Sequence, residues 1–185
     1  PVAIAVGARG FVYVADAVNG TISRYTPEGI FLDSFSGMTG TLHDLAAGPA
    51  GRVYAIAAAG TGIYQYDFES YASHTIHAAP ASASKPGGLF VNATGSYFVV
   101  EPGKARVNKL DAAGSQTASF GSKGRGRGQF RSPTRISGDG GNRVFVLDTG
   151  NNRVQVLRVG EPRAPLTGPV NTLPSVRLTD LDSLN

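Results

Sequence analysis

The chain has 185 residues, of which 41% are hydrophobic and 16% are charged, a balance that excludes an intrinsically disordered protein. It contains no Cys, which excludes disulfides, thiolate metal ligands and a cysteine nucleophile. The net charge of +4 permits an acidic partner without requiring one. No apolar run approaches the roughly 20 residues that a transmembrane helix needs, so no transmembrane segment is expected.

Four apolar runs recur along the chain and end in similar ways. They are "VYVAD", "VYAIA", "YFVVE" and "VFVLD", which end at Asp16, Ala57, Glu101 and Asp148. The positions fifteen residues earlier are Pro1, Leu42, Pro86 and Pro133, and those five residues later are Thr21, Gly62, Arg106 and Arg153. The same register holds without a gap in all four copies, which predicts a repeat protein.

Each copy is expected to consist of strands alone. The runs "VAIAV", "LAAG", "LFVNA" and "RISGD" predict a first strand, and "TISRY", "GIYQYD", "RVNKLD" and "RVQVLR" predict a third. A looser fourth strand follows in "IFLDSFSG" and "SQTASFGS". Apolar residues alternate with a period of two, and turns follow at short intervals. Four antiparallel strands per repeat of 40–50 residues are typical of a β-propeller.

The segments "PVAIAVGARGFVYVADAVNGTISRYTPEGIFLDSFSG" and "SFGSKGRGRGQFRSPTRISGDGGNRVFVLDTGNNRVQVLRVG" resemble NHL repeats. The resemblance covers residues 1–160 and is weak in the second copy, where Ala57 and Gly62 replace the expected Asp and Arg. It implies an all-β propeller of about four NHL-like four-stranded blades, with copies near 1–41, 42–85, 86–132 and 133–160. NHL propellers usually have six blades, so this chain is expected to form either a closed four-bladed ring or part of a larger, six-bladed one. The Pro-rich tail, 161–185, would supply a closing outer strand or clip onto a partner.

Acidic and basic residues face each other across two of the predicted turns. Asp148 precedes Arg153 by five residues, and Glu101 precedes Arg106 by the same spacing. A carboxylate and a guanidinium at these positions meet across a tight hairpin. We therefore interpret both as structural turn pairs, in which the acid also accepts hydrogen bonds from turn amides.

The histidines give little support for catalysis. The resemblance extends to NHL-like lyases, in which zinc is bound by His residues at the starts of inner strands. His43 holds such a position, but its equivalents in the other copies are Val2, Gly87 and Thr134, and a zinc site needs at least three protein ligands. His43 is thus a weak metal candidate, while His74 and His77 are expected on an outer strand. No cofactor is expected.

A basic loop precedes the last copy. It contains Lys123, Arg125, Arg127 and Arg131, with Arg135 just beyond. Some NHL proteins bind RNA on a basic face, so the resemblance implies an anion or nucleic-acid site in loop 123–135. Binding of single strands would also require stacking aromatics, and Phe120 and Phe130 occupy apolar positions of the repeat. The alternative is a solvated or partner-docking loop.

With no convergent catalytic set, the sequence favours a non-enzymatic propeller scaffold that binds proteins as a subunit of a larger assembly. Tyr64, Tyr66 and Tyr71 of the second copy are candidate anchors for a partner, unless they pack between blades. A metal-dependent lyase and an RNA-binding propeller are the alternatives. The first residue, Pro1, and the absence of Cys slightly favour an exported, extracellular or lumenal protein.

Overall fold

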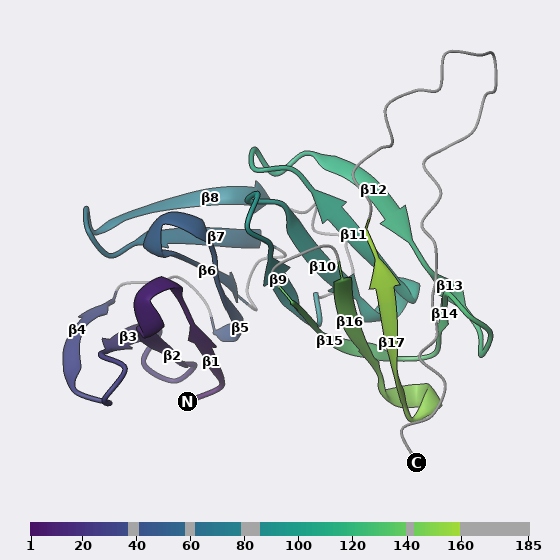
Figure 1. Ribbon diagram of the computed structural model, residues 1–185, viewed down its shortest axis with the longest axis horizontal. Coiled ribbons are helices and arrows are strands. Elements are labelled where there is room, and N and C mark those ends of the chain that lie inside the picture. Colours follow the sequence, from purple (N-terminus) through teal and green to yellow (C-terminus); the bar gives the residue numbers. More distant parts are fainter. Residues whose placement is uncertain (37–40, 58–61, 79–85, 140–142, 160–185) are drawn as a thin grey trace.

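The computed structural model describes residues 1–36, 41–57, 62–78, 86–139 and 143–159. The tail 161–185 lies outside these residues. Four antiparallel sheets follow one another in chain order and stand as blades around a common centre, with β1, β5, β9 and β15 innermost (Figure 1). Three of the sheets have four strands, and three strands are described for the fourth. The prediction of an all-β, four-bladed propeller is therefore confirmed.

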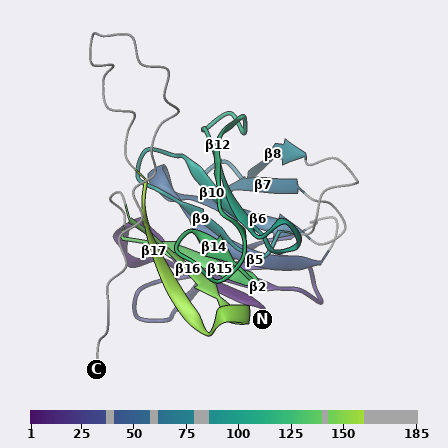
Figure 2. The same cartoon turned by 90° about the vertical axis from the view of Figure 1, so that its right-hand side faces the viewer.

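Every blade of four strands is ordered sequentially from its innermost to its outermost strand, as Figure 2 shows for β5 to β8. The first blade consists of β1 (Ala3–Val6), β2 (Val12–Asp16), β3 (Thr21–Tyr25) and β4 (Phe31–Phe35). The second consists of β5 (Leu42–Ala47), β6 (Arg52–Ala57), β7 (Gly62–Asp67) and β8 (Ala72–Ala78).

The third blade consists of β9 (Leu89–Val91), β10 (Tyr97–Glu101), β11 (Arg106–Leu110) and β12 (Gln116–Phe120). The fourth consists of β15 (Pro133–Gly138), β16 (Arg143–Asp148) and β17 (Arg153–Arg158). Between them lies a short parallel pair, β13 (Ser122–Lys123) and β14 (Gln129–Phe130). Within the residues that the structure describes, helical structure is limited to single 3₁₀ turns: η1 (Ala8–Gly10), η2 (Pro49–Gly51), η3 (Pro102–Lys104) and η4 (Thr149–Asn151). No helix in the described ranges is long and apolar enough to cross a bilayer.

The hydrophobic core lies between successive blades. One cluster joins the first and second blades and includes Tyr13, Ala15 and Leu45. A second joins the second and third blades through residues such as Ile56 and Leu89, and a third joins the last two. Because side chains alternate across a strand, each sheet has two apolar faces, one for each neighbour.

Candidate functional site

The turn of the fourth blade is held by one buried carboxylate. Asp148 ends β16, and its side chain is fully buried. Its Oδ1 accepts hydrogen bonds from the backbone N–H groups of Arg131, at 2.8 Å, and Ser132, at 3.4 Å. Its Oδ2 accepts bonds from Asn151 Nδ2, at 2.7 Å, and Arg153 Nε, at 3.1 Å. Asp148 thus ties the end of the basic loop to the turn.

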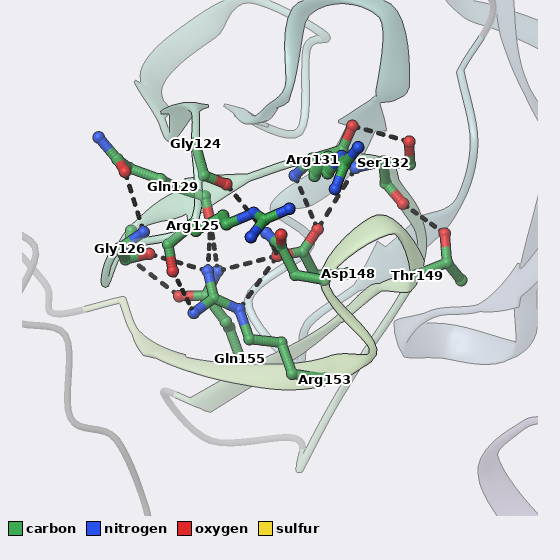
Figure 3. Close-up of polar contacts among 12 residues, drawn as sticks. Gly124, Arg125, Gly126, Gln129, Arg131, Ser132, Asp148, Thr149, Arg153 and Gln155 are labelled. Carbon is green, nitrogen blue, oxygen red and sulfur yellow. Dashed lines mark hydrogen bonds and ion pairs between the residues drawn. The ribbon is translucent and has the colours of Figure 1, made fainter.

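Arg153 is fixed by the basic loop in front of it, and its guanidinium lies among the loop carbonyls in Figure 3. It donates to the backbone carbonyls of Arg125, at 2.7 Å, and of Gly126 and Gln129, at 2.8 and 2.7 Å. Gln155 Nε2 donates to the same Gln129 carbonyl at 2.7 Å. A guanidinium group has five N–H donors in a fixed geometry. Arg153 can therefore bind several loop carbonyls at once, and it holds the basic loop against the fourth blade.

Charge and hydrogen bonds set the ionisation of Asp148. Burial alone would raise the pKa of this carboxyl, because an apolar environment disfavours charge. The bonds from the Arg131 N–H and from Asn151 outweigh that effect, together with Arg153, and hold the pKa of Asp148 below its usual value. Asp148 is therefore ionised near neutral pH.

A polar cavity of about 370 Å³ opens beside this network. Its lining comprises Arg125, Arg131, Gly150, Asn151, Asn152 and Arg153. Arg125 and Arg131 are exposed, while Arg153 is partly buried. Three guanidinium groups against one buried carboxylate leave net positive charge, so the cavity is suited to an anion. Lys123 and Arg127 are exposed but are not among the lining residues.

The aromatics near the basic loop are not available for stacking on bases. Phe130 is fully buried in the cluster between the third and fourth blades. Phe120 is partly buried and packs against the same cluster. Both phenylalanines therefore have the apolar, structural role that the repeat predicts. The basic loop can attract nucleic acid through its charge, but these two rings do not stack on bases.

The third blade carries a turn pair of the same kind. Arg106 Nε donates to Glu101 Oε2, and Lys104 lies 3.3 Å from the other oxygen of Glu101. In the first blade, which has Thr21 at the corresponding position, Asp16 instead accepts bonds from the backbone N–H groups of Val18 and Asn19. The acid position thus organises the turn with or without an arginine.

His43 lies at a bulge in β5, next to Asp44. Asp44 Oδ2 accepts a bond of 2.8 Å from the N–H of Leu89, on the innermost strand of the third blade. Burial raises the pKa of Asp44, although that bond and the nearby charges of Arg135 and His43 oppose the effect. Arg135 donates to the Gly87 carbonyl. His43 and Arg135, both named from the sequence, thus lie near Asp44.

A metal site does not fit these residues. In the described part of the chain, no three His, Cys, Asp or Glu side chains are grouped so that they could hold a metal ion. His43 has Asp44 beside it but lacks a third ligand. The side chains of His74 and His77 lie outside the described set.

The three tyrosines of the second blade have different environments. Tyr66 is 3% exposed and packs between the first two blades. This packing between blades is the alternative to a role as partner anchor for Tyr66. Tyr64 is partly buried against the same cluster. Tyr71 is exposed, but its hydroxyl donates to Asp33 Oδ2 of the first blade at 2.7 Å, so it stabilises a junction between blades.

The first blade exposes a face that the other blades bury. Ile4 is paired with Val14 across β1 and β2, and the equivalent pairs are Leu45 with Ala55, Leu89 with Val99 and Ile136 with Val146. Leu45, Leu89 and Ile136 are 5, 3 and 7% exposed and pack on the preceding blade, whereas Ile4 is 67% exposed. We call Ile4, Val6 and Val14 the incoming face.

The fourth blade exposes the complementary face. Leu147 is paired with Val154 across β16 and β17, at the positions of Ala15 and Ile22 in the first blade. Ala15 and Ile22 are fully buried against the second blade. The equivalent residues of the second blade are buried against the third blade, and those of the third blade are buried against the fourth. Leu147 and Val154 are 40 and 57% exposed. We call Phe145, Leu147 and Val154 the outgoing face.

The sequence analysis named none of the residues of these two faces. The signal was present in the repeat register, because Ile4 and Val154 match positions that are apolar in every copy. The sequence does not say which copy lacks a neighbour, however, so the exposure of these two faces followed only from the arrangement of the blades.

Comparison with known proteins supports the fold. The sequence matches no family model and no curated protein, so membership of the NHL-repeat family stays a prediction. A streptogramin B lyase structure aligns with 84% of this chain and 50% of its own, at 18% identity and a TM-score of 0.68. Virginiamycin B lyase from Staphylococcus aureus aligns with 100% of this chain and 56% of its own, at 16% identity and a TM-score of 0.67.

A catalytically inactive variant of the Staphylococcus aureus enzyme with quinupristin gives a TM-score of 0.66 at 15% identity, over 96% of this chain and 54% of its own. At such identities the likeness shows a shared fold, and this chain is a β-propeller protein. It spans about half the length of the solved structures that it matches.

Proposed function

We propose that the chain is a propeller scaffold that binds protein through the apolar faces of its first and fourth blades. The observation that carries this proposal is the exposure of Ile4, a residue whose three repeat equivalents are all buried between blades. Apolar patches of this kind on a folded surface mark sites of protein association.

The test compares single substitutions in the full chain. Ile4→Asp and Leu147→Asp each place a charge in one face, and Val18→Asp is the control because Val18 is 93% exposed in a turn outside both faces. The immobilised variants are presented to an extract of the source cells. Ile4→Asp or Leu147→Asp should weaken retention of a bound protein by about 30-fold or more, the effect of losing an interface hot spot. Equal retention by all three variants would contradict the proposal.

Anion binding at the fourth blade is a second function, favoured by the cavity with three arginines. Its chemistry fits a phosphate group, on RNA or elsewhere, because guanidinium binds phosphate through paired hydrogen bonds. Affinity for a single-stranded RNA should fall steeply with salt, and Arg125→Ala with Arg131→Ala should abolish it. Arg52→Ala removes an exposed arginine elsewhere and serves as the control. Unchanged retention of RNA by the double variant would rule this function out.

A lyase activity is the remaining alternative, and it is favoured by the fold shared with streptogramin B and virginiamycin B lyases. The site would lie at His43 and Asp44, where a carboxyl with a raised pKa is placed to exchange a proton. Incubation with a streptogramin B compound, with and without added divalent metal, tests it. Cleavage that is lost in Asp44→Asn would support a lyase, and an intact compound in every condition would exclude this substrate class.

A further inference from the structure

Two of the four blades carry an acid, an arginine and an amide side chain at the same three repeat positions. In the fourth blade these residues are Asp148, Arg153 and Gln155, and in the third blade they are Glu101, Arg106 and Asn108. Each arginine donates through Nε to the acid of its own turn. We call Glu101, Arg106 and Asn108 the third-blade triad.

In the fourth blade, the arginine and the amide bind a turn of backbone. Gln155 Oε1 accepts a hydrogen bond of 3.0 Å from the N–H of Gly128, and Gln155 Nε2 donates to the Gln129 carbonyl at 2.7 Å. Arg153 donates to the same carbonyl and to that of Gly126. These two side chains thus recognise a peptide turn by its N–H and C=O groups.

The third-blade triad presents the same groups without such a turn. Asn108 is 7% exposed, and its Oδ1 is buried with no hydrogen-bond donor in the part of the chain that the structure describes. Among the same residues, no acceptor is bonded to the two terminal amino groups of Arg106. Arg106 and Asn108 are two positions apart on β11, so both side chains lie on one face of the sheet. Because buried polar atoms are normally hydrogen-bonded, this pair indicates a site for a ligand.

The sequence before the third blade does not repeat the turn that the fourth blade binds. Gly128 has a φ of +70°, which a residue with a Cβ adopts only with strain. In the repeat register its place is taken by Ala81, and the place of Phe130 is taken by Ala83. Both alanines lie outside the described residues. The third blade therefore has the binding groups of the fourth, but the glycine that meets them there is replaced.

We infer that the third-blade triad binds a glycine-containing turn of another protein. The N–H of the glycine donates to Asn108 Oδ1, and the carbonyls that follow accept from Arg106. Lys104 lies 3.3 Å from Glu101 Oε1, so the charge of this acid is balanced and does not repel carbonyl oxygens. The turn 124–131 of the same chain is not the occupant, because Arg153 and Gln155 already hold it. The site is separate from the two apolar faces and from the basic cavity, so it does not depend on the proposed function.

A synthetic peptide with the sequence of residues 124–131, "GRGRGQFR", is the probe. In the protein this turn is closed by its own hydrogen bonds, from the N–H of Gly124 to the Phe130 carbonyl and from the N–H of Gln129 to the Gly126 carbonyl. Cyclisation of the peptide through its ends keeps that shape and lowers the entropic cost of binding. Titrated into the isotope-labelled full chain at millimolar concentration, it should shift the side-chain NMR signals of Asn108 and Arg106 until they saturate.

The matched control is the same peptide with N-methylglycine at the position of Gly128. It has the same charge and tolerates the same φ, but it lacks the N–H that Asn108 Oδ1 would accept. Its affinity should be lower by about 5-fold or more, since a buried acceptor is left unpaired. Equal affinity of the two peptides would overturn the site.

Substitutions in the protein give the second test. Asn108→Leu and Arg106→Lys should each weaken the binding of the unmodified peptide by about 5-fold or more, whereas Arg52→Ala, which changes an exposed arginine of the second blade, should not. Circular dichroism verifies that each variant is folded. Absence of any shift at Asn108, or a peptide that binds Asn108→Leu as well as wild type, would contradict the inference. Neither result would affect retention of a partner by the two apolar faces.

Discussion

A single buried carboxylate, Asp148, organises the fourth-blade turn by accepting hydrogen bonds from five groups. An amide at this position would direct an N–H₂ group at donors and leave Arg153 without its charge partner. We expect Asp148→Asn to lower the free energy of unfolding by about 1.5–3 kcal/mol, the range for hydrogen bonds to a charged group. Urea denaturation measures the effect.

The control for that substitution is Asp139→Asn. Asp139 also pairs with an arginine, Arg143, at 2.6 Å, but both side chains are partly exposed to solvent. Surface ion pairs contribute roughly 0–1 kcal/mol. A loss for Asp139→Asn as large as that for Asp148→Asn would show that burial is not the deciding factor.

The effect of Asp148 should depend on pH. Its pKa in the folded protein lies below the value of 3.8 in a model peptide, so the unfolded chain takes up its proton first as the pH falls. The stabilisation by Asp148 is complete above that value and is lost as the pH falls through the folded-state pKa. The difference in stability between wild type and Asp148→Asn should therefore shrink below about pH 4, as urea titrations at several pH values would show.

At the scale of an element, the loop into β13 depends on one glycine. Gly121 has a φ of +103°, and a Cβ there would lie 2.5 Å from the ring of the buried Phe130. Gly29 also has a positive φ, +85°, but nothing lies within 4 Å of the site of its Cβ. Both positions strain an alanine, by about 1–2 kcal/mol in the left-handed region.

We expect Gly121→Ala to destabilise the protein by at least about 1 kcal/mol more than Gly29→Ala, because Phe130 must also move and overpacking has its own cost. Thermal unfolding of the two variants, followed by circular dichroism, makes the comparison. Equal melting temperatures would show that the Phe130 ring can move away from a Cβ at position 121 without loss of stability.

At the scale of the whole molecule, equivalent residues of different blades should have unequal effects on stability. Leu89 is buried between the second and third blades, and Leu89→Ala should cost about 2–5 kcal/mol. Ile4 holds the same repeat position on the first blade but is exposed. At a concentration where the chain is monomeric, Ile4→Ala should change stability by no more than about 0.5 kcal/mol. Chemical denaturation measures both variants, and a similar loss for the two would show that the incoming face is covered.

Equivalent residues on the outgoing side of two blades should also differ in their effect on stability. Val107 of the third blade is fully buried, and its equivalent in the fourth blade, Val154, is 57% exposed. Val107→Ala should therefore destabilise the monomer clearly, and Val154→Ala should not. If instead the cost of Val154→Ala rises with protein concentration, the face becomes buried on association, because binding that requires the folded state stabilises it by mass action.

Local pattern determined much of this protein. The alternation in "VYVAD" and "VFVLD" predicted strands, and the repeat register predicted four blades, because a period of two and regular turns depend only on neighbouring residues. The same register predicted that Asp148 and Arg153 would lie opposite each other, as they do across β16 and β17.

Only the tertiary structure decided what each repeat position contacts. Ile4 and Leu89 are equivalent in sequence, yet one is exposed and the other is buried, because burial depends on whether another blade lies against that face. In the same way, Arg153 could be paired with Asp148 from sequence spacing, but its bonds to the carbonyls of Arg125, Gly126 and Gln129 required the fold of the loop. Pattern specifies the surfaces of a blade, and the packing of blades determines which of those surfaces are left to bind.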